Sequence, residues 1–319
     1  MSTNFSRVGL PGGIVEEATQ PAPATGVAFT EGPAADAGGM VYFSDIVNNR
    51  IMRFDSQTGA CTVWRAESGR ANGLLFDPQG RLLACEGNEF GGGGGRRVTR
   101  TDLQTGAIEV LTDRFDGCRY NAPNDIAACS NGRIFFTDPC YDDRSTMELT
   151  HDSVYRIDPD GSVTRVLTQP EIQRPNGIAL APDERTLYLV DSCPVLGGNR
   201  KLWAFDLAPA GTLSGQRLVF DFAPGRGGDG MAVDCEGNLY VAAGIRRPRG
   251  PHETGDVPSG IYVLTPAGEL RGRIPVPEDV LTNVTFGGED LRTLYVTAGK
   301  TLFRFRGRIP GFVVHRRPG

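Results

Sequence analysis

Six oxygen-bearing side chains recur along the chain at the same point of a repeated pattern, where a polar residue opens a short apolar strand. The pattern is clearest at residues 175–180 (PNGIAL), which a turn and a second apolar run follow. The six opening residues are Glu31, Asn72, Asn124, Asn176, Asp229 and Asn283. Carboxylate and amide oxygens are ligands that a hard cation such as Ca²⁺ prefers. If the fold brings these residues together, they could hold a divalent metal ion.

The intervals between these residues indicate a repeated structural unit. Successive intervals are 41, 52, 52, 53 and 54 residues, and each unit holds strand-like runs separated by glycine-containing turns. A period of about 40 to 50 residues with four strands per unit is typical of a β-propeller. We therefore predict an all-β, six-bladed propeller of four-stranded antiparallel blades. Equivalent positions of successive blades converge on one axis, so the six residues would face a central channel.

Two of the six channel residues, Glu31 and Asp229, are carboxylates. Polar residues that open strands can be purely structural, because Asn and Asp satisfy backbone groups in tight turns. Unpaired buried carboxylates are costly, however, and no Arg or Lys opens another blade. Two carboxylates among neutral amide oxygens therefore favour one divalent cation in the channel.

The repeat extends over nearly the whole chain, so we expect one domain over residues 1–319, with residues 1–25 as an N-terminal segment. Closing a propeller commonly combines strands from both termini in one blade, which removes exposed edges. Residues 14–19 could supply the outer strand of the last blade, and residues 311–315 are the competing candidate. We expect no amphipathic helix, and only weak helical character over residues 142–150.

Four longer insertions each follow the second strand of a blade, at residues 88–96, 140–150, 193–200 and 244–259. Segments that follow equivalent strands should emerge at one face of the propeller. Loops gathered on one face of a rigid scaffold commonly build the mouth of a site. We therefore expect the substrate to enter between these four loops.

Composition limits the partners and the compartment. The formal net charge of −5 gives no reason to expect nucleic acid or an anionic membrane. No apolar run reaches the ~18 residues that span a bilayer, and the first residues lack a secretory signal pattern. The seven cysteines are odd in number and form no CxxC pair, which fits reduced thiols. We expect a cytoplasmic protein that binds a small molecule, and the sequence leaves its oligomeric state open.

Several familiar catalytic patterns are absent or out of context. Residues 225–230 match GxGxxG, but a strand-like run follows them where a dinucleotide-binding unit needs a helix. The chain has three histidines and no GxSxG, so a serine hydrolase has little support. No His and Cys cluster has the spacing of a zinc site.

Five short motifs, in order along about residues 26–305, resemble the gluconolactonase, regucalcin and luciferin-regenerating enzyme family. They are residues 30–33 (TEGP), 121–125 (NAPND), 136–139 (FTDP), 174–177 (RPNG) and 228–230 (GDG). The motifs are individually short but jointly specific. The resemblance implies a six-bladed propeller with a divalent metal ion in its channel, usually hydrolysing sugar lactones.

Carried over residue by residue, the resemblance places the family's metal ligands on Glu31, Asn176 and Asp229, with Asn124 as a ligand or a neighbour of the ligands. Asp229 would also be the base. Ca²⁺ is the first expectation, and Zn²⁺, Mn²⁺ or Fe²⁺ are alternatives.

The chain departs from the family pattern at some substrate contacts. Regucalcin-type members have an Arg two residues before the equivalent of Asn124, where this chain has Ala122. In the bacterial pattern, which this chain follows, Asn121 could hydrogen-bond the substrate. Further candidates for substrate contact are Glu86, Tyr141 and Asn283. Glu86 and Tyr141, like Asp191 and Arg246, end a second strand or begin a rim loop, where a structural or surface role is an equal alternative.

Three functions are compatible with these features. The first is a metal-dependent lactonase acting on an aldonolactone, in which Asp229 activates water. The second is a hydrolase of another ester class, since the propeller diisopropyl fluorophosphatase has a similar Glu, Asn, Asn and Asp site. The third is a binding scaffold with a structural ion. Fold-level analogy does not decide the substrate.

Overall fold

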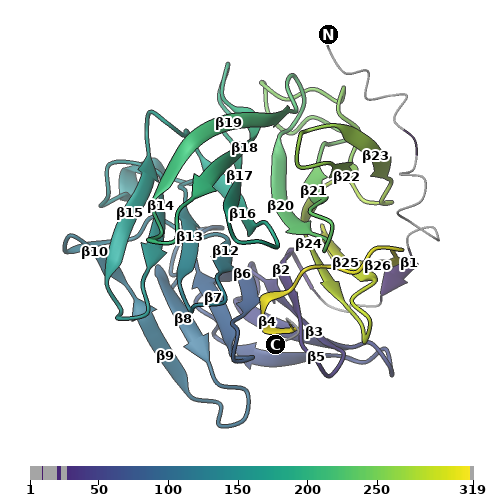
Figure 1. The fold of residues 1–319 in the computed structure, drawn as a ribbon, viewed down its shortest axis with the longest axis horizontal. Coiled ribbons are helices and arrows are strands. Elements are labelled where there is room, and N and C mark those ends of the chain that lie inside the picture. The colour runs from purple at the N-terminus through teal and green to yellow at the C-terminus, as the bar shows by residue number, and fades with distance from the viewer. Residues whose placement is uncertain (1–8, 10–19, 23–26, 317–319) are drawn as a thin grey trace.

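The structure of the protein is a computed structural model that describes Gly9, Gln20–Ala22 and residues 27–316. Six four-stranded antiparallel sheets are arranged around a central axis, with the first strand of each nearest the centre (Figure 1). The predicted six-bladed, all-β propeller is thereby confirmed.

The blades follow one another in chain order. Blade 1 comprises β2 (Thr30–Ala35), β3 (Met40–Asp45), β4 (Arg50–Asp55) and β5 (Cys61–Ala66). Blade 2 comprises β6 (Ala71–Phe76), β7 (Leu82–Glu86), β8 (Arg97–Thr101) and β9 (Ile108–Thr112). Blade 3 comprises β12 (Ile126–Ala128), β13 (Ile134–Asp138), β14 (Ser153–Ile157) and β15 (Val163–Thr168).

Blade 4 comprises β16 (Pro175–Leu180), β17 (Thr186–Ser192), β18 (Arg200–Leu207) and β19 (Leu213–Asp221). Blade 5 comprises β20 (Gly228–Val233), β21 (Leu239–Ala243), β22 (Gly260–Leu264) and β23 (Leu270–Ile274). Blade 6 comprises β24 (Leu281–Gly287), β25 (Thr293–Ala298), β26 (Thr301–Arg306) and β1 (Gln20–Ala22). The ribbon of β10 (Arg114–Phe115) and β11 (Cys118–Arg119) lies between blades 2 and 3 in sequence.

The described part of the chain holds no α-helix, only the 3₁₀ turns η2 (Arg144–Thr146) and η3 (Val314–Arg316). The first of these lies in the window where weak helical character was expected. The hydrophobic core lies between neighbouring blades, because each sheet buries both faces of its second strand. In β13, for example, all five residues are buried. Such two-sided burial explains why second strands read as continuous apolar runs.

An N-terminal strand closes the propeller. Strand β1 pairs antiparallel with β26, so that Gln20 lies opposite Arg304. Residues 14–19, one of the two expected closing segments, lie outside the described residues, and β1 directly follows them. The competing expectation for residues 311–315 was wrong, because Gly311 forms a bridge with Asp234 and the segment packs under the inner strands of the channel.

A β-bulge marks the opening residue in five of the six inner strands. The register against the second strand shifts at Glu31, after Ala71, after Pro175, after Gly228 and before Asn283. A bulge bends the strand and re-aims the side chain beside it. The bulges therefore turn the repeated polar side chains toward the axis while the rest of each strand stays in its sheet.

Glycines after the opening residues let neighbouring inner strands touch. A Cβ on Gly73 would lie 2.5 Å from the carbonyl oxygen of Asn124, and one on Gly177 would lie 2.3 Å from that of Asp229. Instead, Gly73 donates its N–H to Asn124 over 2.6 Å. The Thr137 hydroxyl likewise donates to the carbonyl of Asn176 over 2.8 Å. The inner ring is therefore held by direct contacts between blades, which fixes the spacing of the channel residues.

The four long insertions follow β7, β13, β17 and β21, the second strands of blades 2 to 5, as expected. The insertion after β13 contacts both the insertion after β7 and the end of β17. Phe90 donates its backbone N–H to Asp142 over 2.6 Å, and Tyr141 donates its hydroxyl to the carbonyl of Ser192, the last residue of β17, over 3.2 Å. These contacts join blades 2, 3 and 4 beside their opening residues.

Candidate metal and substrate site

Asp229, the second residue of β20, is the common neighbour of the ionisable groups in the channel. Its negative charge contributes to raising the pKa of Glu31, Glu89, Asp125 and Tyr141, although burial is the largest cause for each of the four. The structure thus brings together Glu31 and Asp229, which lie on β2 and β20 and are far apart in the chain.

The acidic cluster carries unfavourable negative charge. Burial, and after it the charges of Asp229 and Asp142, raises the pKa of Glu89 to about 8. Burial followed by the charge of Asp229 raises the pKa of Glu31 well above its usual range. Like charges in a desolvated site are relieved either by protons or by a bound cation. The cluster therefore has the electrostatic character of a cation site.

Arg226 is the cationic partner of Asp229. Its Nη2 forms an ion pair with Oδ2 of Asp229, and its Nη1 donates to the carbonyl of Leu281 over 2.9 Å. Burial raises the pKa of Asp229, and the charge of Arg226 acts against that rise. The ion pair with Arg226 therefore stabilises the ionised form of Asp229 against the effect of burial.

Asn176 lies beside Asp229 and is held by Tyr141. Its Nδ2 donates to the Tyr141 hydroxyl over 3.0 Å, and a hydrogen bond from the Asn176 side chain helps to lower the pKa of Asp229. Because the amide nitrogen is used in this way, the Oδ1 atom is left as the acceptor. Tyr141, an expected substrate contact, therefore stands next to an expected metal ligand.

Asn124 is oriented from the other side by Glu89. Its Nδ2 lies 3.5 Å from Oε1 of Glu89, which comes from the glycine-rich insertion after β7. Among the described residues, none donates a hydrogen bond to Oδ1 of Asn124 or to Oδ1 of Asn176. Within the described ranges, Glu31 accepts only the N–H of Gly32, at 2.7 Å and through Oε2. Several oxygens of the expected ligands thus remain available.

This donor set fits a divalent cation. In the part of the chain that the structure describes, no three His, Cys, Asp or Glu side chains are grouped as a metal site by themselves. A metal ion bound by Glu31 and Asp229 would therefore also need the amide oxygens of Asn124 and Asn176 as ligands. Two carboxylates with neutral oxygens are the ligands of a hard cation.

Asn121 presents an unused acceptor beside the cluster. Its Nδ2 donates to the carbonyls of His151, over 3.1 Å, and Asp138, over 3.3 Å, whereas its buried Oδ1 has no partner among the described residues. Asn121 lines a small cavity together with Glu89 and Tyr141. An unpartnered buried acceptor next to the rim is a natural contact for a hydroxyl of a bound ligand.

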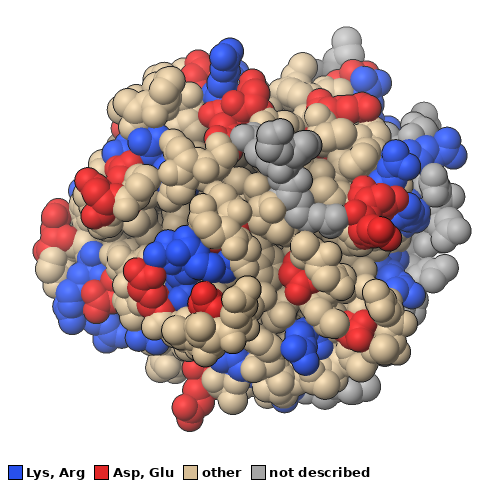
Figure 2. Space-filling model, turned by 60° about the horizontal axis from the view of Figure 1, so that its bottom comes forward, with Lys and Arg blue, Asp and Glu red and all other residues tan. Residues whose placement is uncertain are grey.

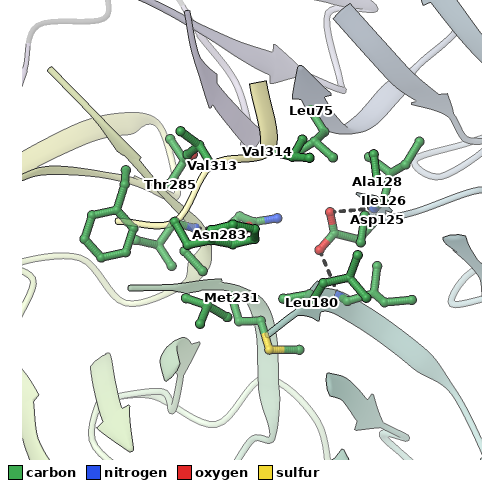
Figure 3. A pocket seen from close by; sticks show the side chains of 18 of the residues that line it. Leu75, Asp125, Ile126, Ala128, Leu180, Met231, Asn283, Thr285, Val313 and Val314 are labelled. Atoms are coloured by element: carbon green, nitrogen blue, oxygen red, sulfur yellow. Dashed lines mark hydrogen bonds between the residues drawn. The ribbon is translucent and has the colours of Figure 1, made fainter. Parts of the chain in front are cut away.

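Asn283 lines a different cavity from the one that Asn121, Glu89 and Tyr141 line. It and Asp125 point toward one another across a cavity of about 90 Å³ (Figure 3). Its Oδ1 accepts the N–H of Val284 over 2.8 Å, and a hydrogen bond from its side chain helps to lower the pKa of Asp125. Residues 312–314 also line this cavity. The expectation that Asn283 binds substrate is therefore not supported, because its side chain supports Asp125.

Glu86 does not join the site either. Its fully buried carboxylate forms ion pairs of 2.6 Å with Nη2 of Arg65 and with Nε of Arg97, and it accepts the Thr99 hydroxyl over 3.1 Å. These partners lie on β5 and β8, so Glu86 joins neighbouring strands within and between blades. Asp191 is likewise structural, because it accepts the backbone N–H groups of Gln173 and Arg174.

The sequence reasoning missed Glu89 and Arg226. Glu89, an acid just before five glycines, could have been singled out from the sequence, since a flexible loop tip has no evident need of a carboxylate. Arg226 was part of the rejected GxGxxG match and received no role. Its pairing with Asp229 depends on how the chain enters β20, which no local pattern reveals.

The surface and the cysteines add little to the site. On the face in Figure 2, basic side chains occur in small groups near acidic ones, and uncharged residues cover most of the area. The seven cysteines all lie in the described residues, and none forms a disulfide bond. No helix in the described residues is long and apolar enough to cross a membrane.

Comparisons with known proteins agree with this architecture. The family model "SMP-30/Gluconolactonase/LRE-like region" matches residues 29–300. A gluconolactonase of Zymomonas mobilis is 30% identical over 315 residues, covering 90% of this chain and 81% of its own. Pentonolactonase XacC of Haloferax volcanii is 30% identical over 262 residues, covering 81% of this chain and 76% of its own.

A solved structure is similar along nearly its whole length. A gluconolactonase from Xanthomonas campestris superimposes with a TM-score of 0.76 at 30% identity, covering 92% of this chain and 91% of its own. Because the family model matches most of the chain and this solved relative shares its length and fold, the chain belongs to the SMP-30/gluconolactonase/LRE-like family.

Proposed function

We propose that the protein is a metal-dependent lactonase that opens the ring of a small sugar lactone. The observation that carries the proposal is the convergence of Glu31 and Asp229 with the free amide oxygens of Asn124 and Asn176 in one desolvated cluster. Relatives named gluconolactonase and pentonolactonase support this substrate class.

Glu31, Asn124, Asn176 and Asp229 would hold the metal ion. When bound, a divalent cation supplies electrophilic polarisation of a carbonyl and stabilises developing negative charge on oxygen. Ca²⁺ is our first assignment, because all four ligands present oxygen atoms.

Asp229 acts as the base that takes a proton from the attacking water. The water oxygen bonds to the carbonyl carbon as the ring carbon–oxygen bond breaks, and the proton held by Asp229 passes to the departing ring oxygen. Arg226 stabilises the ionised form of Asp229, which is the form that can accept a proton from water. Asn121 and Tyr141 orient the substrate, through the unused Oδ1 of Asn121 and the hydroxyl of Tyr141.

A lactone panel tests the proposal. Protein stripped with a chelator is assayed for proton release from glucono-1,5-lactone, above the spontaneous rate, with and without Ca²⁺, Mn²⁺, Zn²⁺ or Fe²⁺. We expect turnover that is lost on stripping and restored by one of these ions. Turnover of diisopropyl fluorophosphate alone would favour the other hydrolase class, and metal binding without any turnover would identify a scaffold.

A further inference from the structure

Two buried arginines near the candidate site have no acidic partner among the described residues. The buried arginines among the described residues are Arg96, Arg174 and Arg200, with exposed fractions of 6%, 7% and 6%. Arg96 pairs with Glu148 at 3.4 Å and also donates to the carbonyl of Tyr120. For Arg174 and Arg200, no carboxylate of the described residues lies within the 4.0 Å of an ion pair. Arginine is rarely buried without a partner, because its desolvated charge is costly.

The guanidinium of Arg174 is the more isolated of the two. Its Nε is buried and has no hydrogen-bond partner, and no described residue accepts a hydrogen bond from its other nitrogens. The guanidinium lies over the ring of Tyr141, whose centroid is 5.5 Å from the Arg174 Cζ atom. A ring face attracts a cation but does not neutralise it. The N–H groups of Arg174 are therefore available to a ligand.

Arg200 also has few hydrogen-bond partners for its guanidinium among the described residues. Its Nη1 donates to the carbonyl of Asn199 over 3.1 Å. Burial is the largest cause that lowers the pKa of Arg200, and the charges of Cys193 and Glu253 act against it. Glu253 forms no ion pair with it, and its carboxylate instead accepts the backbone N–H of Arg249 over 2.9 Å. A backbone carbonyl satisfies one N–H of a guanidinium and leaves its charge without a counterion.

Both arginines adjoin the candidate metal site. Arg174 is two residues before Asn176, and Arg200 lies opposite Ser192, whose carbonyl accepts the Tyr141 hydroxyl. Gly227, two residues before Asp229, lets the Arg200 side chain pack close, since a Cβ there would lie 3.2 Å from its Cδ atom. The two cations therefore lie around Tyr141, beside the ligands from blades 4 and 5.

We propose that Arg174 and Arg200 form a subsite for an anionic substituent, so that the lactone substrate carries an acidic group in addition to its ring ester. A carboxylate or a phosphate matches the donor geometry of a guanidinium and would supply the missing counter-charge. This inference rests on the proposed lactonase function, and it narrows the substrate class to acidic sugar lactones.

The kinetic test compares two lactones that differ only at the sixth carbon. Glucono-1,5-lactone ends in a neutral hydroxymethyl group, and the lactone of glucaric acid that retains a free carboxylate at that carbon ends in an anion. We expect wild-type kcat/KM to favour the acidic lactone by about tenfold or more, the range for a hydrogen bond to a charged group. Arg174→Gln and Arg200→Gln should each lower that preference about tenfold, mainly through KM.

Arg217→Gln is the matched control, because Arg217 is an exposed arginine on the outer strand β19, paired there with Asp206. It should leave the preference unchanged. If wild-type protein hydrolyses the neutral lactone but shows no preference for the acidic one, the subsite is overturned while the lactonase function stands.

A binding test remains decisive even if no lactone is hydrolysed. Calorimetric titrations with gluconate, glucarate and 6-phosphogluconate compare a neutral, a carboxylate and a phosphate terminus. We expect glucarate or 6-phosphogluconate to bind about tenfold more tightly than gluconate, and the tighter of the two identifies the anion. Equal affinities, or a gain that survives Arg174→Gln and Arg200→Gln together in a protein that still melts cooperatively, would overturn the subsite.

Discussion

Arg226 donates from Nη2 to Oδ2 of Asp229, three residues further along the chain, while its Nη1 holds the carbonyl of Leu281 at the start of β24. One guanidinium thus joins the inner strands of blades 5 and 6. It also places a positive charge next to the Asp229 carboxylate, which we propose both binds the metal ion and takes a proton from the attacking water. In the metal-free protein this charge offsets part of the repulsion between Asp229 and Glu31. The same positive charge also repels an incoming metal ion.

Replacing Arg226 should therefore tighten metal binding. In Arg226→Met the positive charge beside Asp229 is lost, and we expect the Kd for Ca²⁺ at pH 8 to fall at least about threefold. Calorimetric titration of chelator-stripped protein measures this, with Arg217→Met as the control for loss of an arginine elsewhere. An unchanged or weaker affinity would mean that Arg226 supports the ligands more than it competes with the cation.

Asp229→Asn should abolish most of the activity without unfolding the protein. The amide keeps one oxygen for the metal but accepts no proton, and loss of a general base typically costs about 10² to 10⁴ in rate. We expect weaker metal binding and a lower kcat even at saturating metal. Asn72→Ala, at the equivalent position of blade 2, should lose much less. If Asp229→Asn retains more than about a tenth of the wild-type kcat, another acceptor takes the proton, and Glu31 is the first to test.

The stability of the metal-free protein should fall as the pH rises from about 4 to about 7. Burial raises the pKa of Asp125 to about 7 in the folded state, against about 3.9 in an unfolded chain. The folded state therefore binds this proton more tightly, and the free energy of unfolding decreases through that window by up to a few kcal/mol.

Denaturant titrations at pH 5.0 and 7.5 measure the effect. In Asp125→Asn the difference between the two pH values should be smaller than in the wild type, although other raised acids such as Glu89 still contribute. The control is Asp102→Asn in an exposed turn. Hydrogen bonds from the Thr105 and Gln104 backbone lower the pKa of Asp102, so its stabilisation is lost only when the pH falls below about 4. An unchanged difference in Asp125→Asn would mean that Asp125 titrates normally.

Gly177→Ala should destabilise the propeller. The new Cβ would lie 2.3 Å from the backbone oxygen of Asp229, which cannot move aside without shifting β20. We expect a loss of at least about 2 kcal/mol in the free energy of unfolding, as in other overpacked interiors. Gly250→Ala is the control, because a Cβ on Gly250 meets no atom within 4 Å. Equal melting temperatures for the two variants would contradict the contact between inner strands.

The insertion after β21 should influence substrate preference without holding the metal. Gly255 approaches the carbonyl oxygen of Arg246, so residues 248–254 can be replaced by two glycines while Val257 stays in the core. We expect the Kd for metal to be retained and the ratio of kcat/KM values between lactones to change. If every ratio stays constant, this loop does not contribute to the substrate site.

The fold could be predicted from the sequence alone, because a repeated pattern is visible without any knowledge of long-range contacts. The polar opening residue and the apolar second strand recur in every unit, and a glycine follows the opening residue in four of the six. Those three features set the number of blades, the channel residues and the four rim loops. The family motifs then placed Glu31, Asn124, Asn176 and Asp229 in one site.

Only the tertiary structure decided which neighbours these residues have. Glu86 stands at the end of a second strand, where a residue of the rim is expected, yet its carboxylate forms an ion pair with Arg65 of the preceding blade. Arg226 reaches Asp229 because the chain turns before β20, and Arg174 lies over Tyr141 because the insertion after β13 folds back toward blade 4. Such pairings depend on the angle and the spacing between blades. Those are fixed by contacts such as that of Gly177 with Asp229, which join residues that no local pattern links.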